Sequence, residues 1–258
     1  MALKWSKTSE GKGKTTFLIY GLPGAGKTWL CRTLPATAES RVLYVGVDPG
    51  QLVLKDKGYW SVKPESKADL DELFFQLRGR LDPSTGKWIP GKCEQGELDW
   101  VVVDGLDDAA DLMLEHYKAT LTTTGGKPDV QNAYGKMAET MAKWIKAMRD
   151  LPNVNVLFIT HIEETMDKNG EMRFRPSFPG KVTHKDLVNW FDFVGCVRFK
   201  SSENDPPARM IQFKGEAGVE YTVKERGYGE YRLSDWEVPD MTAIFKKLGL
   251  SKEKKTNG

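Results

Sequence analysis

The chain has 258 residues, of which 40% are hydrophobic and 29% charged, as expected for one large or two small globular domains. Its formal net charge of +2 gives no overall basic character, so any nucleic-acid function must rest on local patches. No apolar run approaches the ~18 residues that a membrane span needs, which argues against an integral membrane protein.

The cysteines and the N-terminus indicate a reduced intracellular compartment. Cys31, Cys93 and Cys196 lie far apart and form neither a metal-ligand spacing nor a disulfide framework. The first residues, 1–14, are polar and basic without the apolar stretch of a signal peptide. We therefore expect a cytoplasmic protein without membrane contact.

Strand and helix patterns alternate in chain order. Apolar β-rich runs predict strands at 16–20, 42–47, 100–104 and 154–160, with further strands at 193–199, 210–213 and 219–224. Helical periodicity predicts helices at 26–34, 67–80 and 107–120, and a stripe of apolar residues at Met137, Met141, Trp144, Ile145 and Met148. Ser66 is a candidate N-cap. The stripe over residues 137–148 is interpreted as core packing, with a subunit contact as the alternative.

This alternation predicts an α/β fold with a mostly parallel central sheet, flanking helices and additional antiparallel strands in the C-terminal third. Residues 82–97, rich in proline and glycine, predict a surface insertion, and residues 122–128 a polar loop. We divide the chain into an N-terminal extension (1–15), one core domain (16–250) and a basic tail (251–258) expected to be disordered.

The strongest motif is the phosphate-binding loop Gly21-Leu22-Pro23-Gly24-Ala25-Gly26-Lys27-Thr28, followed by Trp29. Its glycines allow the backbone to curl and point N–H groups at phosphates, and the following helix would direct its positive end at the same anion. Lys27 is expected to reach the β- and γ-phosphates, and the Thr28 hydroxyl to ligate Mg²⁺. We therefore predict an ATP site formed by residues 21–29.

Two further positions belong with this loop. Asp104 ends the apolar run Val101–Val103, as the magnesium-holding carboxylate of a Walker B strand does. His161, preceded by Thr160, ends a later strand and is interpreted as a sensor of the γ-phosphate. Asp107 and Asp108 are interpreted as helix-start residues, because Asp favours a first helical turn.

Taken in order, the loop 21–28, Asp48, Asp104, Thr160-His161 and Lys224-x-Arg226 resemble the RecA-like superfamily, specifically its phage-encoded nucleotide-binding proteins and minimal RecA-core single-strand annealing proteins. Three further motifs contribute to the resemblance, namely Leu34-Pro35, Tyr134-Gly135-Lys136 and Phe191-Asp192-Phe193-Val194-Gly195.

The resemblance implies a RecA-type core that binds single-stranded DNA and assembles into a ring or filament. It also implies that Lys224 and Arg226 reach the nucleotide of a neighbouring subunit, and it makes a single-strand binding protein a candidate partner. In the relatives, a catalytic Glu follows the second strand, whereas this chain has Asp48-Pro49-Gly50-Gln51. Asp48 or Gln51 could substitute, so we predict slow ATP hydrolysis.

The candidate DNA-contacting segment runs from Lys168 to Lys185. Cations interleaved with aromatic rings suit single strands, because cations follow phosphates and rings stack on bases. The residues concerned are Lys168, Arg173, Phe174, Arg175, Phe178, Lys181, His184 and Lys185. The alternative is a hairpin-like insertion whose phenylalanines pack inward.

Three functions remain open from the sequence. The leading hypothesis is a DNA-stimulated ATPase that supports annealing or homologous recombination in phage DNA metabolism. The second is a helicase-like or loader ATPase of phage replication. The third is a P-loop small-molecule kinase in which residues 168–185 act as a lid.

Overall fold

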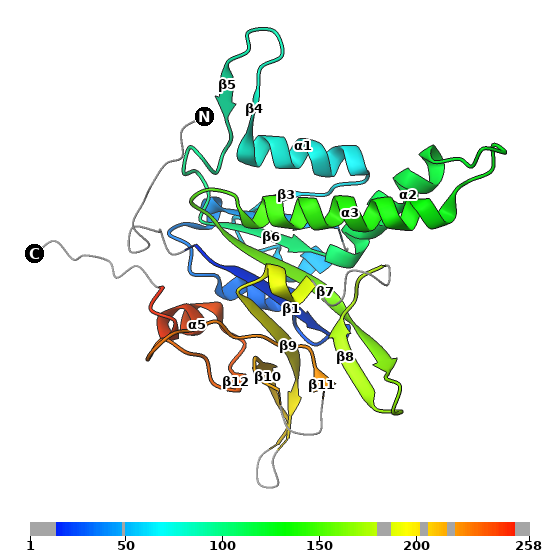
Figure 1. Cartoon of the computed structure of the whole chain (residues 1–258). Helices are drawn as coiled ribbons and strands as arrows, with labels where there is room; N and C mark the ends of the chain where they lie inside the picture. Colours follow the sequence, from blue (N-terminus) through cyan, green and yellow to red (C-terminus); the bar gives the residue numbers. More distant parts are fainter. Residues whose placement is uncertain (1–13, 48–49, 180–186, 202–205, 216–219, 251–258) are drawn as a thin grey trace, which may run out of the picture.

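The computed structural model describes residues 14–47, 50–179, 187–201, 206–215 and 220–250. Its central sheet has the order β12-β10-β9-β1-β7-β6-β2-β3, with β3 to β9 parallel and the edge strands β10 and β12 antiparallel (Figure 1). These strands are β1 (Thr16–Gly21), β2 (Val42–Gly46), β3 (Trp60–Val62), β6 (Trp100–Asp104), β7 (Asn155–Met166), β9 (Phe193–Lys200), β10 (Ala208–Gln212) and β12 (Trp236–Glu237). The predicted fold class is confirmed.

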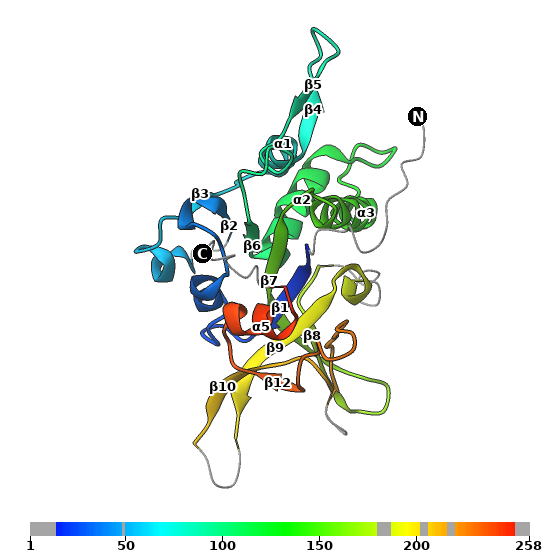
Figure 2. The same cartoon turned by 90° about the vertical axis from the view of Figure 1, so that its left-hand side faces the viewer.

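The sheet separates two apolar cores, because neighbouring residues of a strand point to opposite faces. Leu18 and Tyr20 of β1 pack on one face with helices α1 (Lys67–Arg78), α2 (Leu106–Thr120) and α3 (Val130–Arg149). Phe17 and Ile19 pack on the other with the 3₁₀ helix η2 (Thr28–Thr33) and α5 (Met241–Lys247). Figure 2 shows the three layers edge-on, with α2 and α3 on one side of β1 and α5 on the other.

The helices follow their local sequence signals. The N–H of Asp69 donates to Ser66 Oγ (3.2 Å) at the start of α1, which confirms the predicted N-cap. Gly79, with φ of 99°, follows its last residue. The apolar stripe of α3 is buried against the sheet, which confirms its interpretation as core. The helix α5, whose N-cap is Asp240, was not predicted.

The helix after the phosphate loop is shorter and tighter than predicted. In place of an α-helix over 26–34, the chain forms the 3₁₀ helix η2, and the N–H of Leu30 lies near both Gly26 O and Lys27 O. Gly26 has φ of 91°, and Pro35 cannot donate a helical hydrogen bond. The structure gives no further reason for the 3₁₀ geometry, since the seven residues of Met241–Lys247 suffice for the α-helix α5.

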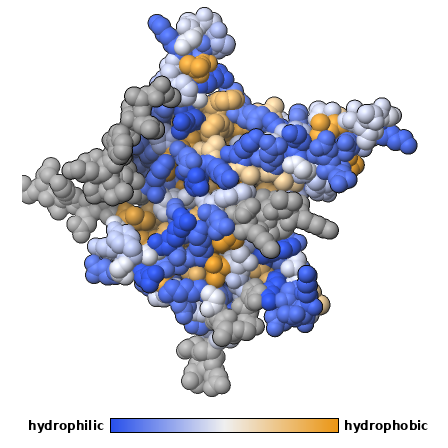
Figure 3. Space-filling view, in the orientation of Figure 1, coloured by the Kyte–Doolittle hydropathy of each residue, from blue (hydrophilic) through white to orange (hydrophobic). Residues whose placement is uncertain are grey.

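Two segments outside the predicted strands form hairpins. The predicted helix over 67–80 ends at Arg78, and β4 (Gly79–Leu81) follows it. This strand pairs with β5 (Trp88–Pro90) of the predicted insertion 82–97, and the hairpin projects from the end of α1 (Figure 1). Figure 3 shows apolar surface at this hairpin and along the neighbouring helices, where Phe75, Leu81 and Ile89 are exposed. After His161, β7 continues to Met166 and returns as β8 (Met172–Pro176), which pairs with β11 (Glu220–Tyr221).

The remaining short elements are 3₁₀ helices, namely η3 (Glu39–Arg41), η4 (Gly50–Leu54) and η5 (Val188–Trp190). Within the described ranges, every helix is too short or too polar to cross a membrane. The expected extension and basic tail lie largely or wholly outside those ranges.

Candidate nucleotide site

The phosphate loop leaves the carboxyl end of β1 at Gly21. Gly24 (φ 75°) and Gly26 (φ 91°) adopt left-handed backbone conformations that residues with a side chain disfavour. The tight turn of the loop therefore requires glycine at these two positions of the motif. Lys27 is 8% exposed, and its ammonium group donates to the carbonyl oxygens of Gly21 (2.9 Å) and Leu22 (3.1 Å). The amine is thereby held above the loop, where phosphates would bind.

The carboxylate of Asp104 faces the phosphate loop from two strands away. Its Oδ2 accepts hydrogen bonds from the Thr28 hydroxyl (2.6 Å) and from the buried Tyr44 hydroxyl (2.8 Å). Burial, followed by the negative charge of Asp104, raises the pKa of the nearby Cys31 thiol well above its usual value. A hydroxyl and a carboxylate are oxygen ligands of the kind that Mg²⁺ prefers, so Thr28 and Asp104 fit the predicted metal.

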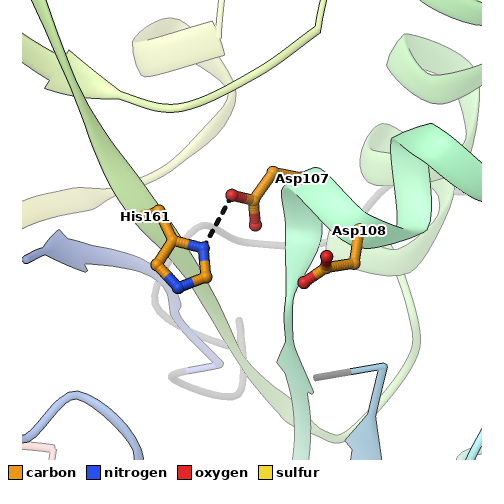
Figure 4. A group of neighbouring side chains, drawn as sticks. All are labelled: Asp107, Asp108 and His161. Atoms are coloured by element: carbon orange, nitrogen blue, oxygen red, sulfur yellow. Dashed lines mark hydrogen bonds and ion pairs between the residues drawn. The ribbon is translucent and has the colours of Figure 1, made fainter. Parts of the chain in front are cut away.

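His161 lies at the same edge, on the strand between β1 and β6. Its Nδ1 donates to Oδ2 of Asp107 in the first turn of α2 (2.9 Å), and Figure 4 shows the second ring nitrogen pointing away from that carboxylate. Because Asp107 accepts, a neutral ring carries its proton on Nδ1 and leaves Nε2 as an acceptor. Asp108 lies close by, with one ligand atom from each of the three side chains within 4.8 Å of the others.

The phosphate loop, Asp104 and His161 border one cavity of about 390 Å³ at the carboxyl edge of the sheet. Its lining combines the loop, the Walker B aspartate and the end of β7, namely Pro23, Gly24, Gly26, Lys27, Thr28, Trp29, Val53, Asp104, Gly105, Ile159, Thr160, His161 and Arg209. The structure therefore brings together the predicted Lys27, Thr28, Trp29, Asp104 and His161. Three contributors were not predicted: Tyr44, the pairing role of Asp107, and Arg209.

The sequence matches the family described as an AAA domain over residues 13–226, most of its length. The chain belongs to this AAA domain family. It is thus an AAA-type P-loop NTPase domain, and the coarse prediction of a P-loop ATPase is confirmed. No curated protein matches the sequence.

Several solved structures are similar to this AAA domain at low sequence identity. An ATPase from the type III secretion system of pathogenic bacteria is 11% identical, with a TM-score of 0.40 over 71% of this chain and 52% of that one. The KaiC-like protein PH0186 of Pyrococcus horikoshii is 10% identical, with a TM-score of 0.37 over 81% of this chain and 83% of that one. The flagellar accessory protein FlaH of Methanocaldococcus jannaschii is 10% identical, with a TM-score of 0.32 over 77% and 76%. The AAA domain spans about half the length of the secretion ATPase chain.

The Lys224-x-Arg226 pair lies at the opposite edge of the sheet of this AAA domain from its own phosphate loop. Lys224 donates to the carbonyl oxygens of Val188 (2.9 Å) and Phe191 (2.7 Å), and burial with the charge of Arg226 lowers its pKa. Arg226 lies 3.5 Å from Asp192, a residue that binds the N-terminal end of β1. Neither cation borders the cavity, so neither is placed to contact a nucleotide bound by its own chain.

The described part of the predicted DNA segment forms the end of β7, a turn and β8. Arg173 pairs with Asp167 (2.5 Å) and Glu171 (3.0 Å), and Arg175 pairs with Glu163 (3.1 Å). Phe174 stacks on Tyr221, and a second ring, Phe178, is only 3% exposed.

The described part of this segment therefore matches the alternative of a hairpin with inward-packed phenylalanines. Lys181, His184 and Lys185 lie outside the described residues. Asp48, the predicted substitute for the catalytic glutamate, also lies outside them, and the structure says nothing of the Gln51 side chain.

Proposed function

We propose that this AAA domain is a magnesium-dependent ATPase, and the observation that carries the proposal is the 2.6 Å contact between Thr28 Oγ1 and Asp104 Oδ2 beside Lys27. In this proposal the loop N–H groups bind the β- and γ-phosphates, and Lys27 neutralises part of their charge. Thr28 and Asp104 would hold Mg²⁺, which supplies further neutralisation of phosphate charge when bound.

His161 is the candidate group for contacting the attacking water. In the proposed step, the water oxygen attacks the γ-phosphorus while the bond to the β–γ bridging oxygen breaks, and ADP leaves with that electron pair. The released proton passes to Nε2 of His161, and Asp107 stabilises the resulting imidazolium through its 2.9 Å bond to Nδ1. This role extends the predicted sensor function of His161 and gives Asp107 a positioning role.

Hydrolysis is expected to be slow, because the chain carries no glutamate at the position where the RecA-like relatives have their catalytic base. Turnover should lie below about 10 s⁻¹, a typical enzyme value. The test is a steady-state ATPase assay with and without Mg²⁺, with Lys27→Ala as the inactive control. Mg²⁺-independent turnover, or turnover retained in Lys27→Ala, would contradict the assignment.

We further propose that the ATPase acts on single-stranded DNA and self-assembles, as the resemblance to RecA-like annealing proteins implies. Support for the DNA role rests on the cation-bearing hairpin Glu163–Pro176, whose arginines would have to exchange their carboxylate partners for phosphates. Both ion pairs are partly buried, so each exchange would cost more than the about 0–1 kcal/mol that an exposed pair contributes.

The DNA proposal is tested by fluorescence anisotropy with a labelled single-stranded oligonucleotide, over a salt series with and without Mg-ATP. Tight binding whose affinity falls with salt is expected, because phosphate contacts release counterions. Arg173→Ala with Arg175→Ala should weaken binding and flatten the salt slope. Absence of binding under every nucleotide condition would contradict the DNA role and leave the ATPase assignment intact.

Self-assembly is tested separately by sedimentation with and without ATP. The proposed role of Lys224 and Arg226 in a neighbouring subunit requires an oligomer, and a monomer at every concentration would exclude it. Phage DNA metabolism and a single-strand binding partner remain parts of the same proposal.

A further inference from the structure

Arg209 reaches the phosphate loop through the antiparallel extension of the sheet. Strand β9 runs parallel to β1 with Val197 beside Gly21, and β10 runs antiparallel to β9 with Ile211 beside Val197. Arg209 is two residues before Ile211, and so lies beyond the carboxyl end of β1. The sheet register therefore places this side chain over the loop that follows β1.

The guanidinium group lies against the loop itself. A Cβ atom built on Gly26 would be 2.6 Å from Nη1 of Arg209 and 2.8 Å from its Cζ atom, so a side chain at this position would push the guanidinium away from the loop. Arg209 also lines the 390 Å³ cavity together with Lys27, Thr28 and His161.

Arg209 also has an unmet hydrogen-bonding need. Its Nε is buried and has no hydrogen-bond partner, and no carboxylate of the described residues lies within 4.0 Å of its guanidinium. By contrast, Arg173 and Arg175 on the β7–β8 hairpin each pair with a carboxylate. A buried donor without a partner is costly, and two neighbouring cations, Lys27 and Arg209, repel each other unless an anion lies between them.

We propose that Arg209 binds the terminal phosphate of ATP held by the phosphate loop of its own chain. The planar guanidinium presents a fork of N–H donors that matches phosphate oxygens, and a charge placed there stabilises the transferring phosphoryl group. This inference rests on the proposed ATPase function and adds the residue that distinguishes ATP from ADP.

The first experiment compares Arg209→Ala and Arg209→Lys with Lys200→Ala, an exposed cation on the neighbouring strand, as the matched control. Dissociation constants for ATP and ADP are measured by calorimetry, turnover by single-turnover hydrolysis, and folding by thermal melting. Arg209→Ala should weaken ATP binding about 10- to 100-fold, the effect of losing a charge-assisted hydrogen bond, while ADP binding stays within about threefold. Turnover should fall at least about 100-fold, given that arginine fingers contribute roughly 10³–10⁵.

Arg209→Lys should recover part of the ATP affinity but little of the turnover, because a point charge replaces the fork. If Arg209→Ala loses affinity equally for ATP and ADP, or binds both with wild-type affinity, the inference is overturned. The proposed function would still stand in either case, provided that the wild-type protein binds Mg-ATP. Failure of the wild-type protein to bind Mg-ATP would overturn both, so the two failures are distinguishable.

A mixing experiment separates action within one chain from action between chains. Arg209→Ala, with an intact loop, is mixed with Lys27→Ala, with an intact arginine. If Arg209 serves its own nucleotide, the mixture remains as inactive as its components. Recovery of hydrolysis on mixing would overturn the assignment, because it would show that the arginine serves a neighbouring subunit.

Discussion

Replacing Asp107 by Asn tests whether the pair with His161 takes part in hydrolysis. The substitution keeps the shape of the side chain but removes the charge 2.9 Å from Nδ1. The amide can also present N–H groups to Nδ1, which would move the ring proton to Nε2 and remove the acceptor facing the cavity.

The size of the effect follows from the environment of the pair. Hydrogen bonds to charged groups contribute about 1.5–3 kcal/mol, and the Asp107 side chain is only 14% exposed. The His161 ring is 34% exposed, so solvent screens part of the interaction and the lower half of that range applies. At 1.4 kcal/mol per factor of ten, Asp107→Asn should lower the turnover number about 10- to 40-fold.

The assay is single-turnover ATP hydrolysis, combined with calorimetric measurement of ATP affinity and with thermal melting. ATP affinity should change less than about threefold, because Asp107 does not line the cavity. The decisive comparison is the double variant with His161→Ala. If Asp107 acts through the ring, Asp107→Asn adds nothing once the ring is absent. Additive losses, or equal losses of affinity and turnover, would refute the reasoning.

Three further predictions follow from the phosphate loop and the core. Tyr44→Phe removes a donor to the buried Walker B carboxylate, and should lower the free energy of unfolding by about 1.5–3 kcal/mol in urea titrations; an unchanged value would contradict the bond. Gly26→Ala should weaken ATP binding at least tenfold more than Gly24→Ala, because both positions have positive φ but only a Cβ at Gly26 meets the guanidinium. Burial raises the pKa of Cys93 and Cys196 to about 12. The free energy of unfolding should therefore be constant below the pKa of about 8.5 that the thiols have in the unfolded chain, and should fall as the pH rises towards 12. At pH 10 the expected loss is roughly 2 kcal/mol per thiol. Chemical denaturation at pH 8 and 10 checks this, and equal stabilities would refute it.

The phosphate site could be predicted from sequence where its residues are consecutive or end a strand. Gly21–Thr28 carries its geometry in its own glycine spacing, and Asp104 follows a run of β-branched valines that favours a buried strand. His161 could be predicted to lie at the phosphate site because it ends a strand, and the carboxyl ends of parallel strands meet at one edge of the sheet. The local backbone pattern sufficed in each case.

The remaining contributors depend on strand order and register, which local patterns do not contain. Tyr44 reaches Asp104 because β2 lies beside β6, and Arg209 reaches Gly26 because β10 is two strands away from β1. Asp107 does occupy the first turn of α2, as predicted, but its partner comes from β7. The spacing of Lys224 and Arg226 predicts that they lie on the same side of a strand. It does not predict that the pair lies near the N-terminal end of β1, away from the phosphate loop.

If the chain binds DNA as proposed, the two antiparallel extensions offer a route by which nucleotide binding and DNA binding would influence each other. Strands β7 and β9 are the two neighbours of β1, and each continues into an antiparallel partner that projects from the lower part of the molecule in Figure 1. The cavity borders both extensions, because His161 directly precedes the antiparallel part of β7 and Arg209 lies on β10. A γ-phosphate held between these residues would fix both extensions relative to the loop, and DNA bound to either would do the same. Binding linkage then requires that any factor by which ATP tightens DNA binding equals the factor by which DNA tightens ATP binding. Both factors should fall to one in Arg209→Ala if the coupling passes through β10, and should persist there if it passes through β7.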